Sequence, residues 1–203
     1  MISVIDYGCG NTNAFINAYK KLNITARVVR SVSELENADK IILPGVGSFD
    51  YVINKFNQSG LRQIVEERVL VEKIDVLGVC AGMQILADIS DEGMEEGLGW
   101  IKGKIKLFDI SKINHTTKIP HMGWNTVDSI KTPIFHGIDK KARFYFVHSY
   151  YFKNYKPSDR IATTHYAGNF TSAVKKDNIY GVQFHPEKSH QNGLKILNNF
   201  AKM

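Results

Sequence analysis

The sequence has few of the features that mark secreted, membrane-spanning or metal-stabilised proteins. Its 203 residues include only two cysteines, Cys9 and Cys80, and these do not form a C-x-x-C pair. This excludes a disulfide scaffold and a structural zinc site, so both thiols are expected to be free. No run of 18 apolar residues occurs, and no basic segment precedes the first apolar stretch. We therefore expect no spanning helix, no signal peptide and a cytoplasmic location.

Positive charge is in excess but is not concentrated. The 26 Lys and Arg residues exceed the 20 Asp and Glu residues, which gives a net charge of +6. The basic residues occur singly or in pairs, and neither a ribonucleoprotein pattern nor zinc-finger spacing is present. A nucleic-acid partner is therefore not expected, whereas a basic face for a protein or an anionic small molecule stays open.

The order of apolar segments predicts an α/β protein. Hydrophobic residues make up 43% of the chain, and no linker or fixed-period repeat divides it, so one domain over residues 1–203 is expected. In the first half, short β-branched runs alternate with amphipathic helical patterns, which predicts a parallel sheet covered by helices. The predicted strands are 2–5, 26–29, 40–43 and 74–79, and the predicted helices are 11–22 and 48–56, the second of which begins at a capping-type serine, Ser48.

In the second half, strand patterns follow one another with only turns between them. This spacing predicts antiparallel or mixed strands added to the sheet. A final helix follows, with an apolar stripe formed by Leu194, Leu197, Phe200 and Ala201. The strands predicted here are 101–107, 124–130, 143–147, 161–164, 171–174 and 179–184.

The segment 74–86 has the pattern of a nucleophile elbow. An apolar strand leads through Gly78-Val79-Cys80-Ala81-Gly82 directly into a helical pattern. Glycines two residues before and after Cys80 permit a sharp turn and a close approach of strand and helix. The helix N-terminus then favours a thiolate and can stabilise an oxyanion. A buried cysteine between packing glycines is the alternative interpretation of these five residues.

A late strand supplies a base for this thiol. Residues 179–187 end in His185-Pro186-Glu187, and residues two apart on an extended chain point the same way. Glu187 is therefore expected to reach the imidazole of His185. Cysteine, histidine and carboxylate would act as nucleophile, proton shuttle and orienting group.

A third segment, 41–49, ends a strand in the glycine-flanked turn Pro44-Gly45-Val46-Gly47. Such a turn can aim backbone N–H groups at a developing negative charge. A dinucleotide fingerprint is the competing interpretation of this turn and of the Gly-Cys-Gly at residues 8–10. Both lack the third glycine of that fingerprint, and no Walker sequence is present, so nucleotide binding is not expected.

Taken together, these motifs resemble a known family. The segments 78–84 and 181–187 are similar to the two signatures of class I, or triad, glutamine amidotransferases. Segments 6–11, 43–49, 120–125 and 146–150 are similar to the glutaminase subunits of imidazole glycerol phosphate synthase. The resemblance covers the whole chain. It implies a three-layer, flavodoxin-like α/β fold with a mostly parallel central sheet and added antiparallel strands.

The resemblance also implies a reaction and roles for particular residues. The chain would hydrolyse L-glutamine to glutamate and ammonia, with no metal or organic cofactor. Cys80 would attack the side-chain amide, His185 would carry the proton, and Glu187 would orient His185. The glutamine would be held by an oxyanion strand and by residues at its amino-acid end, namely Gly45, Val46, Gly47, Gln84, Glu92, Ser149 and Tyr150.

The same resemblance implies a protein partner, the cyclase subunit of a heterodimer that uses the ammonia in histidine biosynthesis. Ala81, the pair Thr12-Asn13 and the long connection 108–118 depart from the usual family pattern. They leave open a paralogue that supplies ammonia for sugar amidation in surface-polysaccharide synthesis. A cysteine peptidase and a noncatalytic binding module are two further alternatives. The residues that would face the partner are Asn11, Pro120, His121, Met122, Gly123, Trp124, Asn125 and Tyr145.

Overall fold

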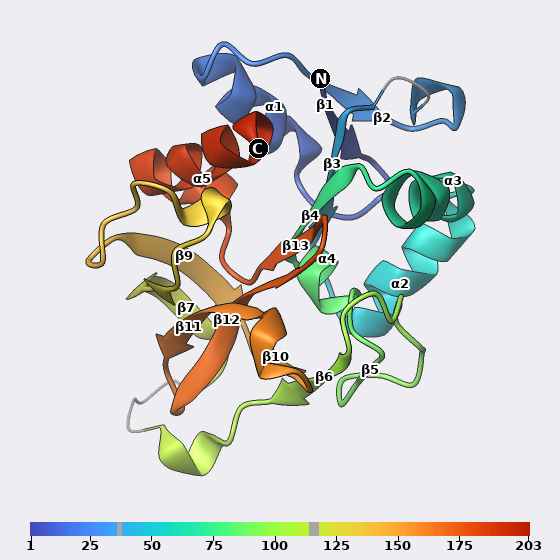
Figure 1. Ribbon diagram of the computed structural model, residues 1–203. Helices are drawn as coiled ribbons and strands as arrows, with labels where there is room; N and C mark the ends of the chain where they lie inside the picture. Colours follow the sequence, from blue (N-terminus) through green and yellow to red (C-terminus); the bar gives the residue numbers. More distant parts are fainter. Residues whose placement is uncertain (36–37, 114–117) are drawn as a thin grey trace.

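A computed structural model describes residues 1–35, 38–113 and 118–203 (Figure 1). Its central feature is a sheet with the strand order β2-β1-β3-β4-β13-β12-β10-β6-β5. The first five strands in this order are parallel to one another. They are β1 (Ile2–Ile5), β2 (Ala26–Val29), β3 (Lys40–Gly45), β4 (Asp75–Cys80) and β13 (Ile179–Val182).

The remaining strands extend this sheet, mainly by antiparallel pairing. β12 joins β13 to β10 and β11, and β10 pairs with β6. A separate antiparallel pair, β7 and β9, lies beside this extension. These strands are β5 (Ile89–Ser90), β6 (Gly103–Leu107), β7 (His121–Thr126), β8 (Asp128–Ser129), β9 (Arg143–His148), β10 (Tyr150–Asn154), β11 (Arg160–His165) and β12 (Asn169–Lys176).

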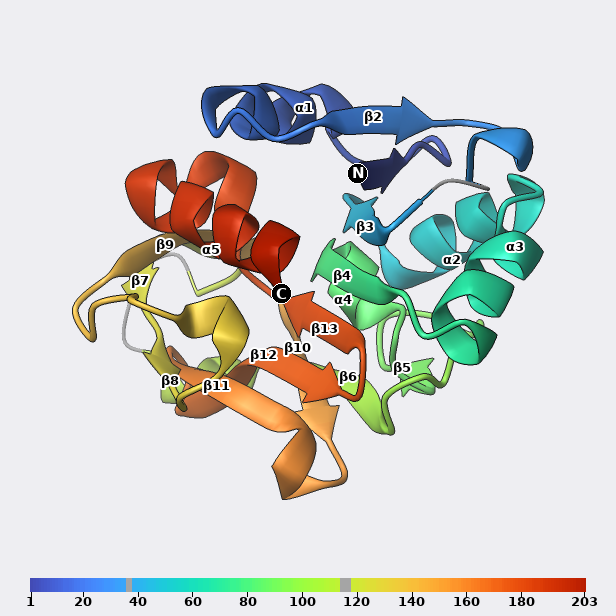
Figure 2. The same ribbon diagram turned by 45° about the horizontal axis from the view of Figure 1, so that its top comes forward.

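Helices cover both faces of the parallel part, so the protein has three layers (Figure 2). α1 (Thr12–Lys21) and α5 (His190–Lys202) lie on one face. α2 (Phe49–Gln58) and α3 (Arg62–Glu66) lie on the other. The shorter helical segments are α4 (Ala81–Gln84), a π-helical turn at Glu67–Val71, and 3₁₀ turns at Ser33–Leu35, Ile110–Lys112, Pro133–Phe135, Pro157–Asp159 and Pro186–Lys188.

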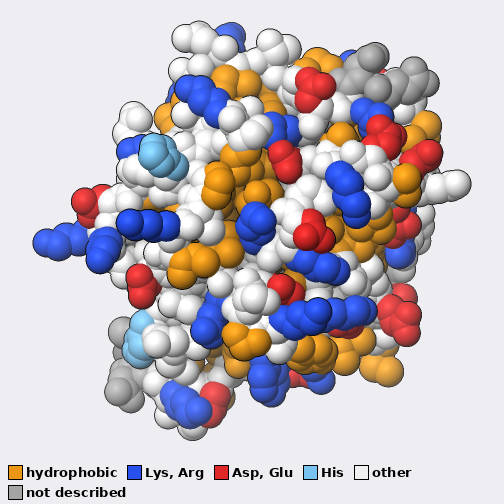
Figure 3. Space-filling view, in the orientation of Figure 1, with side chains coloured by type: hydrophobic (Ala, Val, Ile, Leu, Met, Phe, Trp, Pro, Cys, Tyr) orange, Lys and Arg blue, Asp and Glu red, His pale blue; other side chains and the backbone are white. Residues whose placement is uncertain are grey.

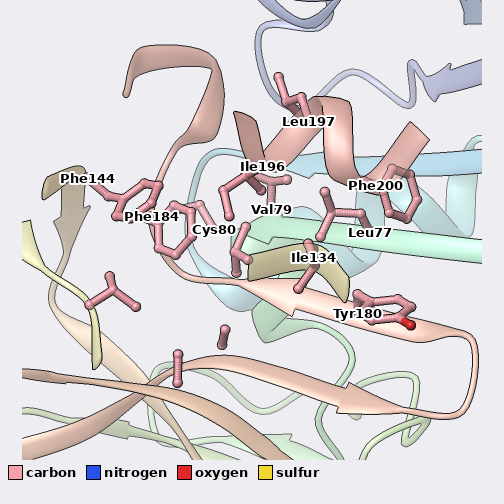
Figure 4. Close-up of a cluster of buried hydrophobic side chains, with 14 of the residues drawn as sticks. Leu77, Val79, Cys80, Ile134, Phe144, Tyr180, Phe184, Ile196, Leu197 and Phe200 are labelled. Carbon is pink, nitrogen blue, oxygen red and sulfur yellow. The ribbon is translucent and has the colours of Figure 1, made fainter. Parts of the chain in front are cut away.

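Two hydrophobic cores form because successive side chains of a strand point to opposite faces of the sheet. On β3, Ile42 belongs to the core under α1 and α5, whereas Ile41 and Leu43 belong to the core under α2. Figure 4 shows the first core, where Leu197 and Phe200 of α5 lie over strand residues. The end of β4 is thereby held between two packed layers, which fixes the position of Cys80.

Much of this architecture agrees with the sequence-based expectations. The α/β fold class with a mostly parallel sheet and added antiparallel strands is confirmed. The strands at 2–5 and 26–29 have the predicted bounds. The apolar stripe of α5 differs in part, because Ile196 is fully buried whereas Leu194 and Ala201 are half-buried.

Other boundaries were predicted wrongly. The predicted strand 124–130 is two strands, β7 and β8, and β7 already begins at His121. Strand β10 and the helical segments at 62–71 were not predicted. The helix after Cys80 ends at Gln84 after one turn, so its dipole is weaker than a long helix would supply. Residues 114–117 of the long connection at 108–118 lie outside the described residues.

The surface agrees with the dispersed charge of the sequence. On the face in Figure 3, Lys and Arg side chains are spread among Asp and Glu side chains and do not form a patch of one sign. Across the described ranges, no helix has the length and hydropathy needed to cross a membrane.

Candidate active site

The elbow at Cys80 has a backbone conformation that requires close packing around it. Cys80 ends β4 with φ +55° and ψ −114°, an unusual conformation for a residue other than glycine. A Cβ atom on Gly82 would lie 2.0 Å from the Leu43 carbonyl oxygen, and one on Gly78 would lie 2.6 Å from the Gly82 oxygen. Only glycine fits at these two positions. The strained turn is therefore maintained by contacts between backbone atoms.

Cys80 is buried, with 7% of the residue exposed, and it lines a cavity. Its sulfur lies 3.9 Å from the Val147 carbonyl oxygen and 3.7 Å from Nε2 of Gln183. Figure 4 shows Cys80 beside Phe184, at the edge of the hydrophobic core. The contact of Gln183 with Cys80 was not predicted from the sequence. Its position two residues before His185 on the same extended segment was the available signal, because such residues share one face.

His185 and Glu187 are paired as their spacing suggests. Nδ1 of His185 lies 2.7 Å from Oε1 of Glu187, and both side chains are nearly inaccessible to solvent. Nε2 of His185 makes no hydrogen bond among the described residues. Burial alone would lower the pKa of His185, but interactions with Cys80 and then with Glu187 raise it well above its ordinary value. Glu187 occupies Nδ1, so Nε2 is the nitrogen left to carry a proton, and His185 lines the same cavity as Cys80.

The turn after β3 forms a second side of the cavity. Val46 is 53% exposed, and Gly47 has φ +131°, a conformation that favours glycine. Gly45 is buried, and a Cβ there would lie 2.2 Å from the Gly82 nitrogen. The Tyr7 hydroxyl donates to the Pro44 carbonyl, which anchors the start of the turn. Val46 and Gly47 follow this anchored residue and line the cavity.

The cavity has a volume of about 190 Å³, smaller than the usual pocket for a drug-sized ligand. All the predicted substrate-binding residues except Gly45 line it, together with two of the three predicted catalytic residues. Glu187 lies behind His185 and does not line it. Residues that sequence analysis had not assigned to the pocket also contribute. The full lining is Val46, Gly47, Cys80, Ala81, Gln84, Glu92, Val147, His148, Ser149, Tyr150, His185 and Lys188.

Gln84 has a fixed orientation in this cavity. Its Nε2 donates to the Tyr150 carbonyl oxygen at 3.0 Å and to Oε1 of Gln183 at 3.1 Å. A carbonyl can only accept, so the amide nitrogen must face Tyr150. Both of its N–H groups are then used, which leaves the Gln84 amide oxygen available to a donor in the cavity.

Glu92 has a second role that the sequence did not reveal. Its Oε2 accepts a hydrogen bond of 2.8 Å from the backbone N–H of Phe49, the first residue of α2. Ser48 occupies the N-cap position but makes no side-chain cap bond, so the expected serine cap is wrong. Burial raises the pKa of Glu92, and the Phe49 N–H opposes this shift. The carboxylate is therefore positioned by a helix N-terminus at the edge of the cavity.

The predicted partner-facing residues lie in different environments. On β7, Met122 is 62% exposed and Trp124 is 38% exposed, whereas His121 is 4% exposed. Asn11 is exposed and caps α1 by accepting from the Ala14 N–H. Tyr145 is half-buried, with its ring 6.1 Å from that of Trp124. The role of these residues at a partner stays a prediction.

Two further observations bear on alternative sites. A cavity of about 600 Å³ is lined by residues between Val127 and Lys140 and contains none of the residues just described. Within the described part of the chain, no group of three or more His, Cys, Asp or Glu side chains could hold a metal ion.

The fold and the elbow define a class of protein, and comparison with known proteins agrees. The family profile described as "Glutamine amidotransferase class-I" matches residues 3–203, so the chain belongs to the class-I glutamine amidotransferase family. The solved structure titled "Crystal structure of glutamine amidotransferase" is 19% identical with a TM-score of 0.76, covering 100% of this chain and 99% of that one. A structure of PurLQS from Thermotoga maritima is 17% identical, has a TM-score of 0.75 and covers 99% and 97%. These two structures support the fold alone.

Sequence comparison shows which members of this family the chain is similar to. The protein named imidazole glycerol phosphate synthase subunit HisH in Leptospira interrogans is 50% identical, over 100% of both chains. The protein of the same name in Bdellovibrio bacteriovorus is 47% identical, over 100% of both chains. In Pseudomonas aeruginosa, the protein named imidazole glycerol phosphate synthase subunit HisH 2 is 43% identical, again over 100% of both. The resemblance stated from the motifs is thus confirmed.

Proposed function

We propose that this chain is the glutaminase subunit of an imidazole glycerol phosphate synthase and supplies ammonia for histidine biosynthesis. The observation that carries this proposal is one small cavity lined by Cys80, His185 and a fixed Gln84, with Glu187 paired to His185 behind the cavity wall. The full-length similarity to HisH subunits supports the choice of synthase.

The reaction begins with the Cys80 sulfur. Loss of its proton to Nε2 of His185 gives a thiolate, which attacks the side-chain carbonyl carbon of glutamine. The Glu187 carboxylate at Nδ1 stabilises the resulting imidazolium. The tetrahedral intermediate collapses when Nε2–H protonates the departing nitrogen, so the C–N bond breaks and ammonia leaves. Cys80 remains as a γ-glutamyl thioester.

Water then completes the cycle. Nε2 of His185 accepts a proton from a water molecule as the oxygen attacks the thioester carbon. The C–S bond breaks, the sulfur recovers its proton from His185, and glutamate is released. Each turnover consumes one glutamine and one water, releases one glutamate and one ammonia, and needs no cofactor.

The walls of the cavity supply binding and charge stabilisation. The turn at Val46 and Gly47 would direct a backbone N–H at the oxyanion, an interaction worth about 3 to 4 kcal/mol in other hydrolases. The free amide oxygen of Gln84 and the carboxylate of Glu92 are both acceptors, and they suit the α-ammonium group of glutamine. Ser149 and Tyr150 close the opposite side.

The partner would be a cyclase subunit that binds the surface containing Met122 and Trp124. Exposed aromatic and methionine side chains are typical of protein interfaces. Ammonia released to solvent would be lost to the synthase, so control of the reaction by the partner is expected. The anchored Pro44 and the exposed Val46 give the oxyanion turn a fixed end and a free end, which permits such control.

The test is glutamate release by the purified chain alone and with the cyclase subunit of the same organism loaded with its nucleotide ligand. We expect slow turnover alone and an increase of about a thousandfold in the complex, equivalent to about 4 kcal/mol of transition-state stabilisation. Stimulation only by a sugar-amidating enzyme would reassign the chain to that paralogous pathway. Full activity of the isolated chain would contradict control by a partner.

A further inference from the structure

Two buried histidines connect the surface strand β7 with the wall of the cavity. His121 of β7 and His148 of β9 are paired across the two strands, and both are at most 7% exposed. Nδ1 of His121 lies 3.0 Å from Nε2 of His148. Neither residue belongs to the catalytic set proposed above, although His148 contributes to the cavity lining.

At the contact between His148 and the Tyr150 carbonyl, only His148 can be the donor. Nδ1 of His148 lies 2.7 Å from the Tyr150 carbonyl oxygen, which can only accept. Nδ1 of His148 must therefore carry a hydrogen, and a neutral His148 then accepts at Nε2. It follows that Nδ1 of His121 is the donor between the two rings.

The outer end is fixed independently by Asn125. Its Oδ1 accepts from the Thr126 N–H at 2.8 Å, and its Nδ2 donates to the His165 carbonyl at 2.9 Å. Backbone groups thus set the orientation of this amide. Nδ2 also lies 3.2 Å from Nε2 of His121, which has to accept, in agreement with the tautomer required by His148.

Both rings are neutral in this arrangement. Burial lowers the pKa of His121 to about 4 and, together with the neighbouring His121, lowers that of His148 to about 3. Aromatic side chains enclose the pair, with the Phe146 ring 4.9 Å and the Tyr166 ring 4.1 Å from the His121 ring. The hydrogen bonds therefore all run in one direction. Asn125 donates to His121, His121 donates to His148, and His148 donates to the Tyr150 carbonyl.

The Tyr150 carbonyl is where this series of hydrogen bonds meets the cavity. Its oxygen accepts from His148 and also from Nε2 of Gln84, so both of its lone pairs are occupied. We propose that His121 and His148 are positioning residues that hold the Tyr150 carbonyl, and through it Gln84, in the orientation that binds glutamine. This inference rests on the proposed function, because it assigns Gln84 to the substrate.

The series of hydrogen bonds also gives β7 a physical connection to the cavity. Met122 and Trp124 of this strand are exposed, while His121 and Asn125 take part in the hydrogen bonds. A partner that displaces β7 would alter the His121 donor and thereby the Tyr150 carbonyl. Glutamine affinity would then change without any contact between partner and substrate.

The test compares KM and kcat for glutamine at saturating cyclase subunit. His121→Phe keeps a ring in the aromatic cluster but removes the donor to His148, and we expect KM to rise about tenfold with a smaller change in kcat. His121→Asn places an amide N–H near the former Nδ1 and is expected to restore KM to within about threefold of the wild type. Asn125 lies at the half-exposed end of this series of hydrogen bonds, and Asn125→Ala should raise KM a few-fold. This variant replaces His121→Phe in the test if His121→Phe does not fold.

Phe170→Leu is the matched control, because Phe170 packs 5.2 Å from the His148 ring and supplies no hydrogen bond. A merely structural role would give this variant the same KM shift as His121→Phe, and that result would overturn the inference. Unchanged KM in both His121→Phe and Asn125→Ala would also overturn it. Absence of wild-type turnover would overturn the proposed function and this inference together, whereas unchanged KM in an active chain overturns only the inference.

Discussion

The two sides of the cavity are held in place by different means. At the ends of β3 and β4, Gly45, Gly78 and Gly82 allow backbone atoms to meet at contact distance. On the opposite side, residues 147–150 are held by side-chain hydrogen bonds from Gln84 and His148. Close-packed backbone has few alternative positions, whereas a hydrogen bond can be lengthened or exchanged. The first side is therefore suited to the chemical step and the second to adjustable substrate binding.

The largest expected effect comes from the nucleophile at the end of β4, on the first side of the cavity, which we call the rigid side. Cys80→Ala should lower glutaminase turnover by about 10⁴-fold or more and leave the fold intact, because the elbow accepts a small side chain. Cys9→Ala is the matched control. Cys9 is also buried and free, but it is hydrogen-bonded to no histidine among the described residues, so most activity should remain. Glutamate release measures the activity of the two variants, and thermal unfolding measures their stability. Equal losses of activity would show that Cys80 is not the nucleophile.

The proton carrier and its orienting group are expected to act as one unit. His185→Asn should cost nearly as much turnover as removal of the thiol, and Glu187→Gln about ten to a hundredfold less. The double variant should be no slower than His185→Asn alone, because Glu187 acts only through the imidazole. Single-turnover rates of the three variants check this, and multiplicative losses would refute a shared role.

A third prediction concerns stability on the rigid side. Gly82→Ala places a Cβ 2.0 Å from the Leu43 oxygen, so we expect a loss of about 3 kcal/mol or more in the free energy of unfolding. At Gly60 φ is +73°, but a Cβ there would have no atom of the described residues within 4 Å, so Gly60→Ala should cost only about 1 to 2 kcal/mol for the backbone conformation. Urea denaturation separates the two. Equal costs would mean that the elbow is looser than its contacts indicate.

The smallest expected effect tests where rigidity ends in the oxyanion turn. Tyr7→Phe removes the donor to the Pro44 carbonyl, and we expect kcat to fall about tenfold or less, with KM little changed. Tyr19→Phe is an equivalent change, because that buried hydroxyl donates to the Leu197 carbonyl at 3.4 Å, under α5. It should lower stability without affecting kcat. Identical kinetic constants for the two variants would show that the Tyr7 hydroxyl does not help to position the oxyanion turn.

The contrast between the two sides also explains what could be predicted from sequence. Elbow glycines lie next to Cys80 in the chain, and Glu187 lies two residues from His185, so local spacing was enough to find them. The roles of His148 and Gln183 depend on the register of β9 against β7 and on the pairing of β13 with β4. Such contacts between distant segments are not encoded in any short pattern.

The prediction of a serine cap at Ser48 was wrong for a related reason. Ser48 has the residue type and the position of a cap, but Glu92, which lies 43 residues after Phe49 in the chain, accepts from the Phe49 N–H at the start of α2 instead. Local propensity is overridden when tertiary structure brings a charged acceptor to the same donor. The residue proposed to bind substrate thus also stabilises the helix that follows the oxyanion turn.

The measurement that tests the central claim most directly is synthase activity of the complex containing Cys80→Ala, with glutamine or with ammonium salt as the nitrogen source. If this chain serves only to release ammonia through Cys80, the variant complex makes product from ammonium salt at the wild-type rate and almost none from glutamine. Glutamine-dependent synthesis within tenfold of the wild type would contradict the account.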